Sequence, residues 1–187
     1  MSAAGPAHST ADAANHLETL LDEQGIDTAH FAGNSMGGAL ALELATRGRA
    51  RSVVAISPGG GWEEHDTAEP ERIIKWFARN QALGKRTEKH LERVMRRPGA
   101  RRLALRDVMA RGDQVPAEDA VELARSSIRC AVVDDVFETI RSGAGRVQGL
   151  DRIDVPVLLA WGTKDRILPL DKHAGSFRRL IPGVEYR

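Results

Sequence analysis

The pattern of apolar and polar residues predicts a helix near the start of the chain. Ser9 or Thr10 can cap a helix that begins near Ala11, and Gly25 can end it in the left-handed conformation. Its apolar face comprises Ala13, Leu17, Leu20 and Leu21, with Ala14 beside them. Residues 1–8 are small and polar, so we expect a disordered lead-in before this helix.

Short apolar runs predict three strands that alternate with helices. The runs lie near residues 28–33, 52–57 and 155–161. A helix rich in Ala and Leu begins at Met36 and is closed by Gly48. Another amphipathic helix, LDKHAGSFRRLI, follows the third run, and the closing PGVEYR looks like the entry to a further strand. This alternation is typical of an α/β fold with a parallel sheet.

Residues 62–149 have a different pattern, which predicts a helical insertion. They are mostly charged, show helical periodicity and contain no convincing strand. Prolines at positions 70, 98 and 116 divide the segment, so we expect two to five helices. The core would then consist of residues 9–61 and 150–187.

Composition is ordinary and excludes several classes of protein. Of the 187 residues, 42% are hydrophobic and 28% charged, and the net charge of +1 gives no overall attraction to nucleic acid or to an anionic membrane. No run of about 18 apolar residues predicts a membrane span, and the start lacks the pattern of a secretory signal. We therefore expect a cytoplasmic protein. The single cysteine, Cys130, excludes an intrachain disulfide and predicts a small buried side chain.

The stretch HFAGNSMGGALAL carries the candidate chemistry. Its Gly33-Asn34-Ser35-Met36-Gly37 segment has the form Gly-x-Ser-x-Gly, between an apolar strand and a helix. A nucleophile at such a turn sits in a strained conformation with positive φ, and we expect glycines two residues before and after it to make room. A phosphate-binding loop is the rival reading, but the sequence has no Gly-Lys-Ser/Thr and no Gly-x-Gly-x-x-Gly.

Three blocks of the sequence resemble the α/β-hydrolase family, in the branch with a helical cap. They are HFAGNSMGGALALELATRG, SVVAISPGGGW and IDVPVLLAWGTKDRILPL. The resemblance implies that Ser35 is the nucleophile and that Asp165, in a Trp-Gly-x-x-Asp pattern, is the acid of a triad. The Met36 N–H would donate to an oxyanion at the start of its helix. Residues 62–149 would form the cap.

The base of the triad has no good candidate among the six histidines. The resemblance implies a histidine after the last strand, and only His173 follows Asp165, within a predicted helix. His30 lies on a strand and is expected to be a core residue. The remaining histidines lie in the lead-in (His8), on the first helix (His16) and in the helical insertion (His65 and His90). The family also carries earlier strands and a His-Gly motif that residues 1–28 do not supply. We therefore expect a chain truncated at both ends.

The expected function is that of a serine hydrolase portion acting on a carboxylic ester, impaired by the missing histidine. Alternatives are carbon–carbon bond hydrolysis by the same fold, and a non-catalytic vestigial fragment. Epoxide hydrolases and haloalkane dehalogenases are disfavoured, because the resemblance implies that they use aspartate at the position of Ser35. We expect a small-molecule substrate, no cofactor, no metal, and no nucleic-acid or membrane partner.

Two further features have two interpretations each, and a third concerns the edge of the sheet. The basic stretch 85–111 can be a nucleic-acid surface, but its interspersed acidic residues favour a solvated cap face. Trp62, Trp76 and Phe77 can line a substrate pocket or pack cap against core. The first strand would be an unprotected sheet edge, which invites self-association.

Overall fold

The computed structural model describes residues 9–63, 65–130, 133–142 and 145–187, so the predicted lead-in 1–8 lies outside the described residues. Contacts divide the chain into a sheet unit, Met1–Thr67 with Asp134–Arg187, and a helical unit, Ala68–Val133. The helical insertion predicted over 62–149 is therefore longer than the helical unit, because residues 134–149 group with the sheet. Its role as a cap stays a prediction.

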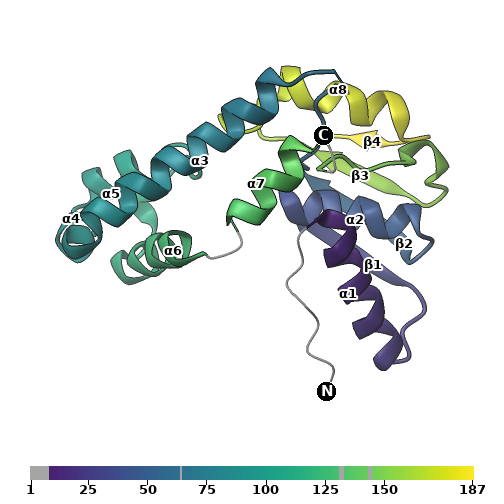
Figure 1. Cartoon of the computed structure of the whole chain (residues 1–187), viewed down its shortest axis with the longest axis horizontal. Coiled ribbons are helices and arrows are strands. Elements are labelled where there is room, and N and C mark those ends of the chain that lie inside the picture. The colour runs from purple at the N-terminus through teal and green to yellow at the C-terminus, as the bar shows by residue number, and fades with distance from the viewer. Residues whose placement is uncertain (1–8, 64, 131–132, 143–144) are drawn as a thin grey trace. The chain divides into compact units, whose positions relative to one another are not determined.

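The sheet unit is an α/β structure with a parallel sheet. Its elements are α1 (Thr10–Glu23), β1 (Ala29–Asn34), α2 (Met36–Thr46), β2 (Ala50–Ile56), α7 (Val133–Arg141, from Asp134 on), η3 (Leu150–Arg152), β3 (Val157–Ala160), α8 (Leu170–Leu180) and β4 (Glu185–Tyr186). The strands lie in the order β1-β2-β3-β4, and every neighbouring pair is parallel (Figure 1). The predicted parallel sheet is confirmed, and the closing residues do form a short strand.

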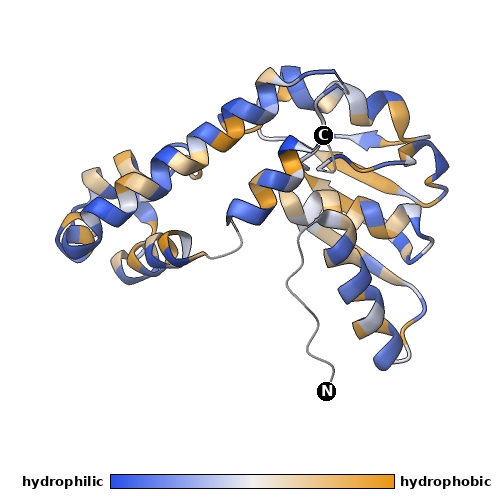
Figure 2. Cartoon of the chain, in the orientation of Figure 1, coloured by the Kyte–Doolittle hydropathy of each residue, from blue (hydrophilic) through white to orange (hydrophobic). Residues whose placement is uncertain are grey.

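The two faces of the sheet differ in burial. Because side chains alternate along a strand, the register places Val53, Ala55, Val157 and Leu159 on one face, and all four are buried. Helix α2 packs against β1 and β2, and the apolar colours of α2 and β3 are visible in Figure 2. The other face, called here the open face, carries Ala32, Val54, Ile56, Leu158 and Ala160. These residues are half-buried or exposed, with Ile56 at 43%.

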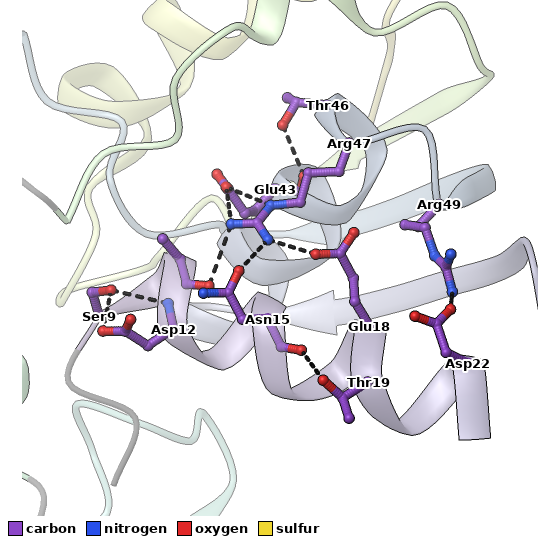
Figure 3. A network of polar contacts seen from close by, with 11 residues as sticks. Ser9, Asp12, Asn15, Glu18, Thr19, Asp22, Glu43, Thr46, Arg47 and Arg49 are labelled. Atoms are coloured by element: carbon purple, nitrogen blue, oxygen red, sulfur yellow. Dashed lines mark hydrogen bonds and ion pairs between the residues drawn. The ribbon is translucent and has the colours of Figure 1, made fainter. Parts of the chain in front are cut away.

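Helices α1 and α2 are tied together by Arg47 at the end of α2 (Figure 3). Its guanidinium donates to Asn15 Oδ1 at 2.7 Å and Glu18 Oε2 at 2.6 Å on α1, and to Glu43 Oε1 at 3.0 Å on α2. Burial lowers the pKa of Arg47, but the hydrogen bonds and charges of Glu18 and Glu43 outweigh this effect and leave it raised. The cation is therefore bound in its charged form.

The predicted caps of α1 are confirmed, but its predicted face is only partly correct. Ser9 Oγ accepts from Asp12 N at 3.0 Å, and Gly25 has φ 67°. Ala14 is fully buried, whereas Leu20 is 52% exposed. At about 100° per residue, Leu20 lies roughly 120° around the helix from Ala14, so it cannot face the same neighbour.

Two buried positions predicted from the sequence are exposed in the structure. Cys130 follows the last residue of its helix, where the chain turns extended and leaves the buried face that includes Ile128. The His30 side chain points to the open face of the sheet, where its Nδ1 lies 2.7 Å from Ser52 Oγ. Both predictions of burial were based on apolar neighbours in the sequence. They are wrong because the burial of a residue on a strand or at a helix end depends on which face of that element is covered.

The helical unit has its own hydrophobic core. Its elements are α3 (Ala68–Thr87), η1 (Glu88–His90), α4 (Leu91–Met95), α5 (Pro98–Ala104), η2 (Gly112–Gln114) and α6 (Ala117–Arg129). The core cluster comprises Leu91, Met95, Leu105, Ala120, Val121 and Ile128. The three prolines lie at helix starts, where a missing N–H costs little. Within the described residues, α7 brings the number of α-helices between β2 and β3 to five, which is within the predicted range.

No helix in the described ranges is both long and apolar enough to cross a membrane. The cytoplasmic location and the absence of a nucleic-acid partner stay predictions.

Candidate active site

The candidate nucleophile Ser35 lies between β1 and α2 in an unusual backbone conformation. Its φ is 54° and its ψ is −118°. Among the described residues, only Ser35 and Ser57 are non-glycine residues with positive φ. Such conformations cost about 1–3 kcal/mol each and persist only where the surroundings enforce them. The strain predicted from the Gly-x-Ser-x-Gly pattern is therefore present.

Hydrogen bonds on both sides of Ser35 enforce this conformation. The Ile56 carbonyl at the end of β2 accepts from Ser35 N at 3.0 Å and from Asn34 Nδ2 at 3.0 Å. The Ser35 carbonyl accepts from Gly59 N at 3.0 Å and from Ala39 N at 3.1 Å. The turn is thus bound to the neighbouring strand, to the loop after it and to α2.

The glycines around Ser35 are not equivalent. A Cβ on Gly33 would overlap the Gly37 carbonyl group and lie 2.7 Å from Gly38 N, so Gly33 is sterically required as predicted. A Cβ on Gly37 would meet nothing within 4 Å, so the prediction that Gly37 makes room is wrong. The second close approach is at Gly38, whose Cβ would lie 3.1 Å from Gly33 O and 3.1 Å from Pro58 Cα.

The Ser35 hydroxyl is not used to cap the helix that follows it. Ser9 precedes α1 in an extended conformation, and its hydroxyl accepts from Asp12 N. Ser35 precedes α2 but makes no side-chain capping hydrogen bond. The positive φ turns the side chain away from the capping position, which leaves the hydroxyl available for chemistry.

The start of α2 provides N–H donors beside Ser35. The first intrahelical bond is donated by Ala39, so the N–H groups of the preceding helical residues have no partner within the helix. Met36 is the first of these, and its side chain is 59% exposed. The Met36 N–H can therefore donate to an oxygen that gains negative charge next to Ser35.

Asp165 lies in the loop after β3 and holds that loop in place. Its Oδ1 accepts from Ile167 N at 3.0 Å and from Leu168 N at 2.9 Å, and its own N–H donates to Gly162 O at 3.0 Å. Trp161 supports the same loop by donating from Nε1 to Leu168 O at 2.9 Å. Within the described residues no hydrogen bond reaches Asp165 Oδ2, so this oxygen can orient a base.

Ser35 and Asp165 lie at the same edge of the sheet. Each follows the carboxyl end of a parallel strand, and β2 separates the two strands. Strands are about 4.8 Å apart, so β1 and β3 are separated by about 10 Å, a gap that an imidazole between the two groups can bridge. Among the described residues no hydrogen bond joins Ser35 to Asp165.

None of the histidines in the described part of the chain is hydrogen-bonded to Ser35 or Asp165. His173 is fully buried on α8, stacked on Trp161 with ring centroids 6.5 Å apart, and Trp62 meets it edge-on at 6.3 Å. Trp62 therefore packs in the core of the sheet unit. In the helical unit, Trp76 contacts Phe77 edge-on at 4.8 Å and donates to Asp107 at 3.3 Å.

Sequence reasoning missed Ser57 and the loop that follows it. Ser57 has φ 42°, is 4% exposed and donates its N–H to Ala160 O at 2.8 Å. Gly59 then contacts the Ser35 carbonyl. The signal was the Ser-Pro-Gly-Gly-Gly run directly after a buried strand, which indicates a strained turn beside the nucleophile.

Metal ligands do not gather at this site. Within the described residues, no group of three or more His, Cys, Asp or Glu side chains could hold a metal ion. The expectation of no metal and no cofactor stays a prediction.

A model of the alpha/beta hydrolase family matches residues 2–185. The chain belongs to the alpha/beta hydrolase family. It is 32% identical over 176 residues to the epoxide hydrolase EphH of Mycobacterium tuberculosis, with 93% of this chain and 80% of that protein covered.

Two other proteins that are similar to the chain are longer than it. A 2-hydroxy-6-oxononadienedioate/2-hydroxy-6-oxononatrienedioate hydrolase of Pseudomonas sp is 25% identical over 162 residues, which cover 81% of this chain and 52% of that protein. The crystal structure of a membrane phospholipase A, described as a bacterial virulence factor, aligns with a TM-score of 0.70 at 22% identity. The alignment covers 99% of this chain and 56% of the phospholipase chain. The chain thus spans little more than half of these two relatives.

Proposed function

We propose that this chain carries the nucleophile and the acid of a serine hydrolase that transfers an acyl group from a carboxylic ester to water. The observation that carries the proposal is the conformation of Ser35, which is strained, fixed by four hydrogen bonds and free of any capping role. A serine that only capped α2 would have the extended conformation of Ser9.

The proposed reaction follows from the positions of the groups. Ser35 Oγ attacks the ester carbonyl carbon, its proton passes to an imidazole, and the carbonyl oxygen becomes an oxyanion that the Met36 N–H stabilises. Collapse expels the alcohol, which takes the proton back from the imidazolium. Water then repeats the sequence on the acyl-serine ester and releases the acid. Asp165 Oδ2 would orient the imidazole and stabilise its cation.

We further propose that turnover by the 187-residue chain is impaired. Among the described residues no histidine is hydrogen-bonded to Ser35 or Asp165, and general-base assistance is typically worth about 10²–10⁴ in rate. Added imidazole should replace the base in part. Hydrolysis of p-nitrophenyl acetate by the chain should lie near background and should rise with imidazole beyond the rise seen with Ser35→Ala.

The acid has its own control in that experiment. Asp165→Asn keeps an oxygen for the two loop N–H groups but cannot stabilise the imidazolium by charge, so it should reduce the imidazole-dependent rate. Equal imidazole-dependent rates for the chain and Ser35→Ala would refute the proposed nucleophile. Fast hydrolysis without imidazole would refute the impairment, and His173→Ala would then test whether His173 is the base.

Carbon–carbon bond hydrolysis is the second candidate. The Pseudomonas relative is named as a hydrolase of 2-hydroxy-6-oxononadienedioate. This compound contains a ketone and no ester, so its hydrolysis cleaves a carbon–carbon bond. The two reactions can be separated by supplying a 2-hydroxy-6-oxo-dienoate and a p-nitrophenyl ester to the same sample. Ser35-dependent consumption of the dienoate without ester cleavage would favour this second candidate.

Epoxide hydrolysis is suggested by the name of the mycobacterial relative, but the serine at position 35 disfavours it. A serine oxygen that opened an epoxide would form an ether, which water does not cleave, whereas an aspartate would form a hydrolysable ester. We therefore expect no diol from styrene oxide. Ser35-dependent diol formation over many turnovers would contradict this expectation.

A further inference from the structure

Ser176 is a buried serine of α8 that the proposed reaction does not use. It is 7% exposed, and its Oγ lies 2.6 Å from Gly61 O and 3.2 Å from His173 O. A serine within a helix often donates back to a carbonyl of its own helix, three or four residues earlier. A hydroxyl has one proton to donate, and the shorter contact assigns it to Gly61, in the loop after β2. The Ser176 hydroxyl therefore binds α8 to that loop.

The loop after β2, residues 57–61, is packed tightly against α8. A Cβ added to Gly61 would lie 2.5 Å from His173 O and 2.6 Å from Phe177 Cε2. These distances are too short for a real Cβ, so the backbone of the loop approaches α8 as closely as a glycine allows. The loop has no room to move toward α8, and the Ser176 hydroxyl keeps it from moving away.

The same loop binds the turn that carries Ser35. Gly59 N donates to Ser35 O at 3.0 Å. Pro58 is fully buried against α2, where a Cβ on Gly38 would lie 3.1 Å from Pro58 Cα. A single residue separates Gly59 from Gly61, so a displacement of Gly61 is transmitted to the Gly59 N–H. Two hydrogen bonds of this loop therefore link the Ser35 carbonyl to α8.

We propose that Ser176 is a positioning residue for Ser35. The strained conformation of Ser35 needs support from its surroundings, and the Gly59 N–H supplies part of that support. The hydrogen bond between Ser176 and Gly61 fixes this N–H in place. This role depends on the proposed function of Ser35 as the nucleophile.

The substitution Ser176→Ala removes the donor of the Gly61 carbonyl. Because Gly61 is buried, its carbonyl then shifts to find another partner. The bond from Gly59 N to Ser35 O weakens, and Ser35 Oγ loses its alignment with the carbonyl carbon that it attacks.

Amide hydrogen exchange measured by NMR tests the link between Ser176 and Ser35. The Ser35 carbonyl accepts from Gly59 N in the loop and from Ala39 N in α2. Ser176→Ala should speed exchange at Gly59 about fivefold or more. Exchange at Ala39 should not change, because that bond is made within the first turn of the helix. A general loss of stability would speed both amides alike.

The rate of labelling by a fluorophosphonate tests the consequence for the nucleophile. Addition of the label to Ser35 should be about tenfold slower in Ser176→Ala than in the unaltered chain. Ser126→Ala is the matched control and should leave the rate unchanged. It also removes a hydroxyl from a helix, but the Ser126 hydroxyl is exposed on α6, 3.3 Å from Glu122 Oε1. Circular dichroism verifies that both variants fold.

The outcomes separate this role of Ser176 from the proposed function. Equal labelling rates for the unaltered chain and Ser176→Ala would overturn the role of Ser176 and leave Ser35 as the nucleophile. Unchanged exchange at Gly59, or equal acceleration at Gly59 and Ala39, would do the same. The absence of label from Ser35 in the unaltered chain would refute the proposed function itself.

Discussion

At the scale of single residues, the site depends on close backbone contacts that surround Ser35. Gly33 is close to the Gly37 carbonyl, Gly38 is close to Pro58, and the Ser35 peptide is bound at both ends. The motif in the sequence predicted Ser35 and Gly33 correctly. It assigned a steric role to Gly37 and missed Gly38, because the contact with Pro58 forms only when β2 pairs beside β1.

The two glycines of the motif should therefore respond differently to substitution. Gly33→Ala forces the Gly37 carbonyl to move and should lower the free energy of unfolding by about 1–3 kcal/mol. Gly37→Ala is the matched control, because its Cβ enters open space on a helix, where Ala is favoured over Gly by up to about 1 kcal/mol. Urea unfolding of both variants measures this difference, and equal losses would show that Gly33 does not lie in close contact with the Gly37 carbonyl.

The strain at Ser35 predicts a conflict between stability and chemistry. Ser35→Gly tolerates φ 54° without cost, whereas Ser35→Ala keeps a Cβ in the strained conformation. We expect Ser35→Gly to be more stable than Ser35→Ala by about 1–2 kcal/mol in urea unfolding, although neither has a nucleophile. If Ser35→Ala proved the more stable of the two, the backbone at this turn would not be strained.

At the scale of secondary structure, apolar periodicity predicted the sheet unit well. The expected helices and strands up to β2 all exist, since each has both a strong apolar pattern and a local stop signal such as Gly25 or Gly48. Burial was harder to predict. His30 and Ile56 lie on apolar strands but face the open side of the sheet, and a one-dimensional pattern does not say which face a helix covers.

The contact between α1 and α2 should depend on Arg47. Arg47→Met keeps most of the apolar stem but leaves the half-buried Glu18 and Glu43 without their shared cation. We expect a loss of about 1–2 kcal/mol in the free energy of unfolding. Arg179→Met is the control, because the Arg179–Glu63 pair is more than half exposed on both sides and is worth no more than about 1 kcal/mol.

The pH dependence of this contact follows from the raised pKa of Arg47. A raised value in the folded state favours folding at every pH below the unfolded value, and the contribution is lost only as pH rises through the folded value. The difference between the chain and Arg47→Met should therefore persist through neutral and moderately alkaline pH. Its disappearance near neutral pH would contradict the assignment.

At the scale of the whole molecule, the chain consists of two compact units, and the helical unit has a separate core. Alternating strands and helices in the sequence predicted the sheet unit, and the family match agrees with it. The sequence pattern predicted one helical segment over residues 62–149, whereas contacts group Ala68–Val133 into the helical unit. The charged pattern of α7 resembles that of the preceding helices, and only contacts assign it to the sheet.

The separate core predicts local effects of mutation. Leu105 is 6% exposed within the cluster of the helical unit, and Leu103 is 63% exposed two residues earlier. Leu105→Ala should destabilise residues 68–133 by about 2–4 kcal/mol, whereas Leu103→Ala should have little effect. Hydrogen exchange measured by mass spectrometry should show faster exchange in this unit and unchanged protection in β2 and β3. Equal acceleration in β2 and β3 would mean that the units unfold together.

Covalent labelling by a fluorophosphonate tests the central claim, that Ser35 is the nucleophile of an alpha/beta hydrolase site, most directly. Intact-mass and peptide analysis should show slow addition of one label, located on Ser35, because no described histidine assists it. Ser35→Ala should abolish the label, and Ser9→Ala, which removes the capping serine of α1, should leave it unchanged. A label on another serine, a label that survives Ser35→Ala, or none after prolonged reaction would contradict the claim.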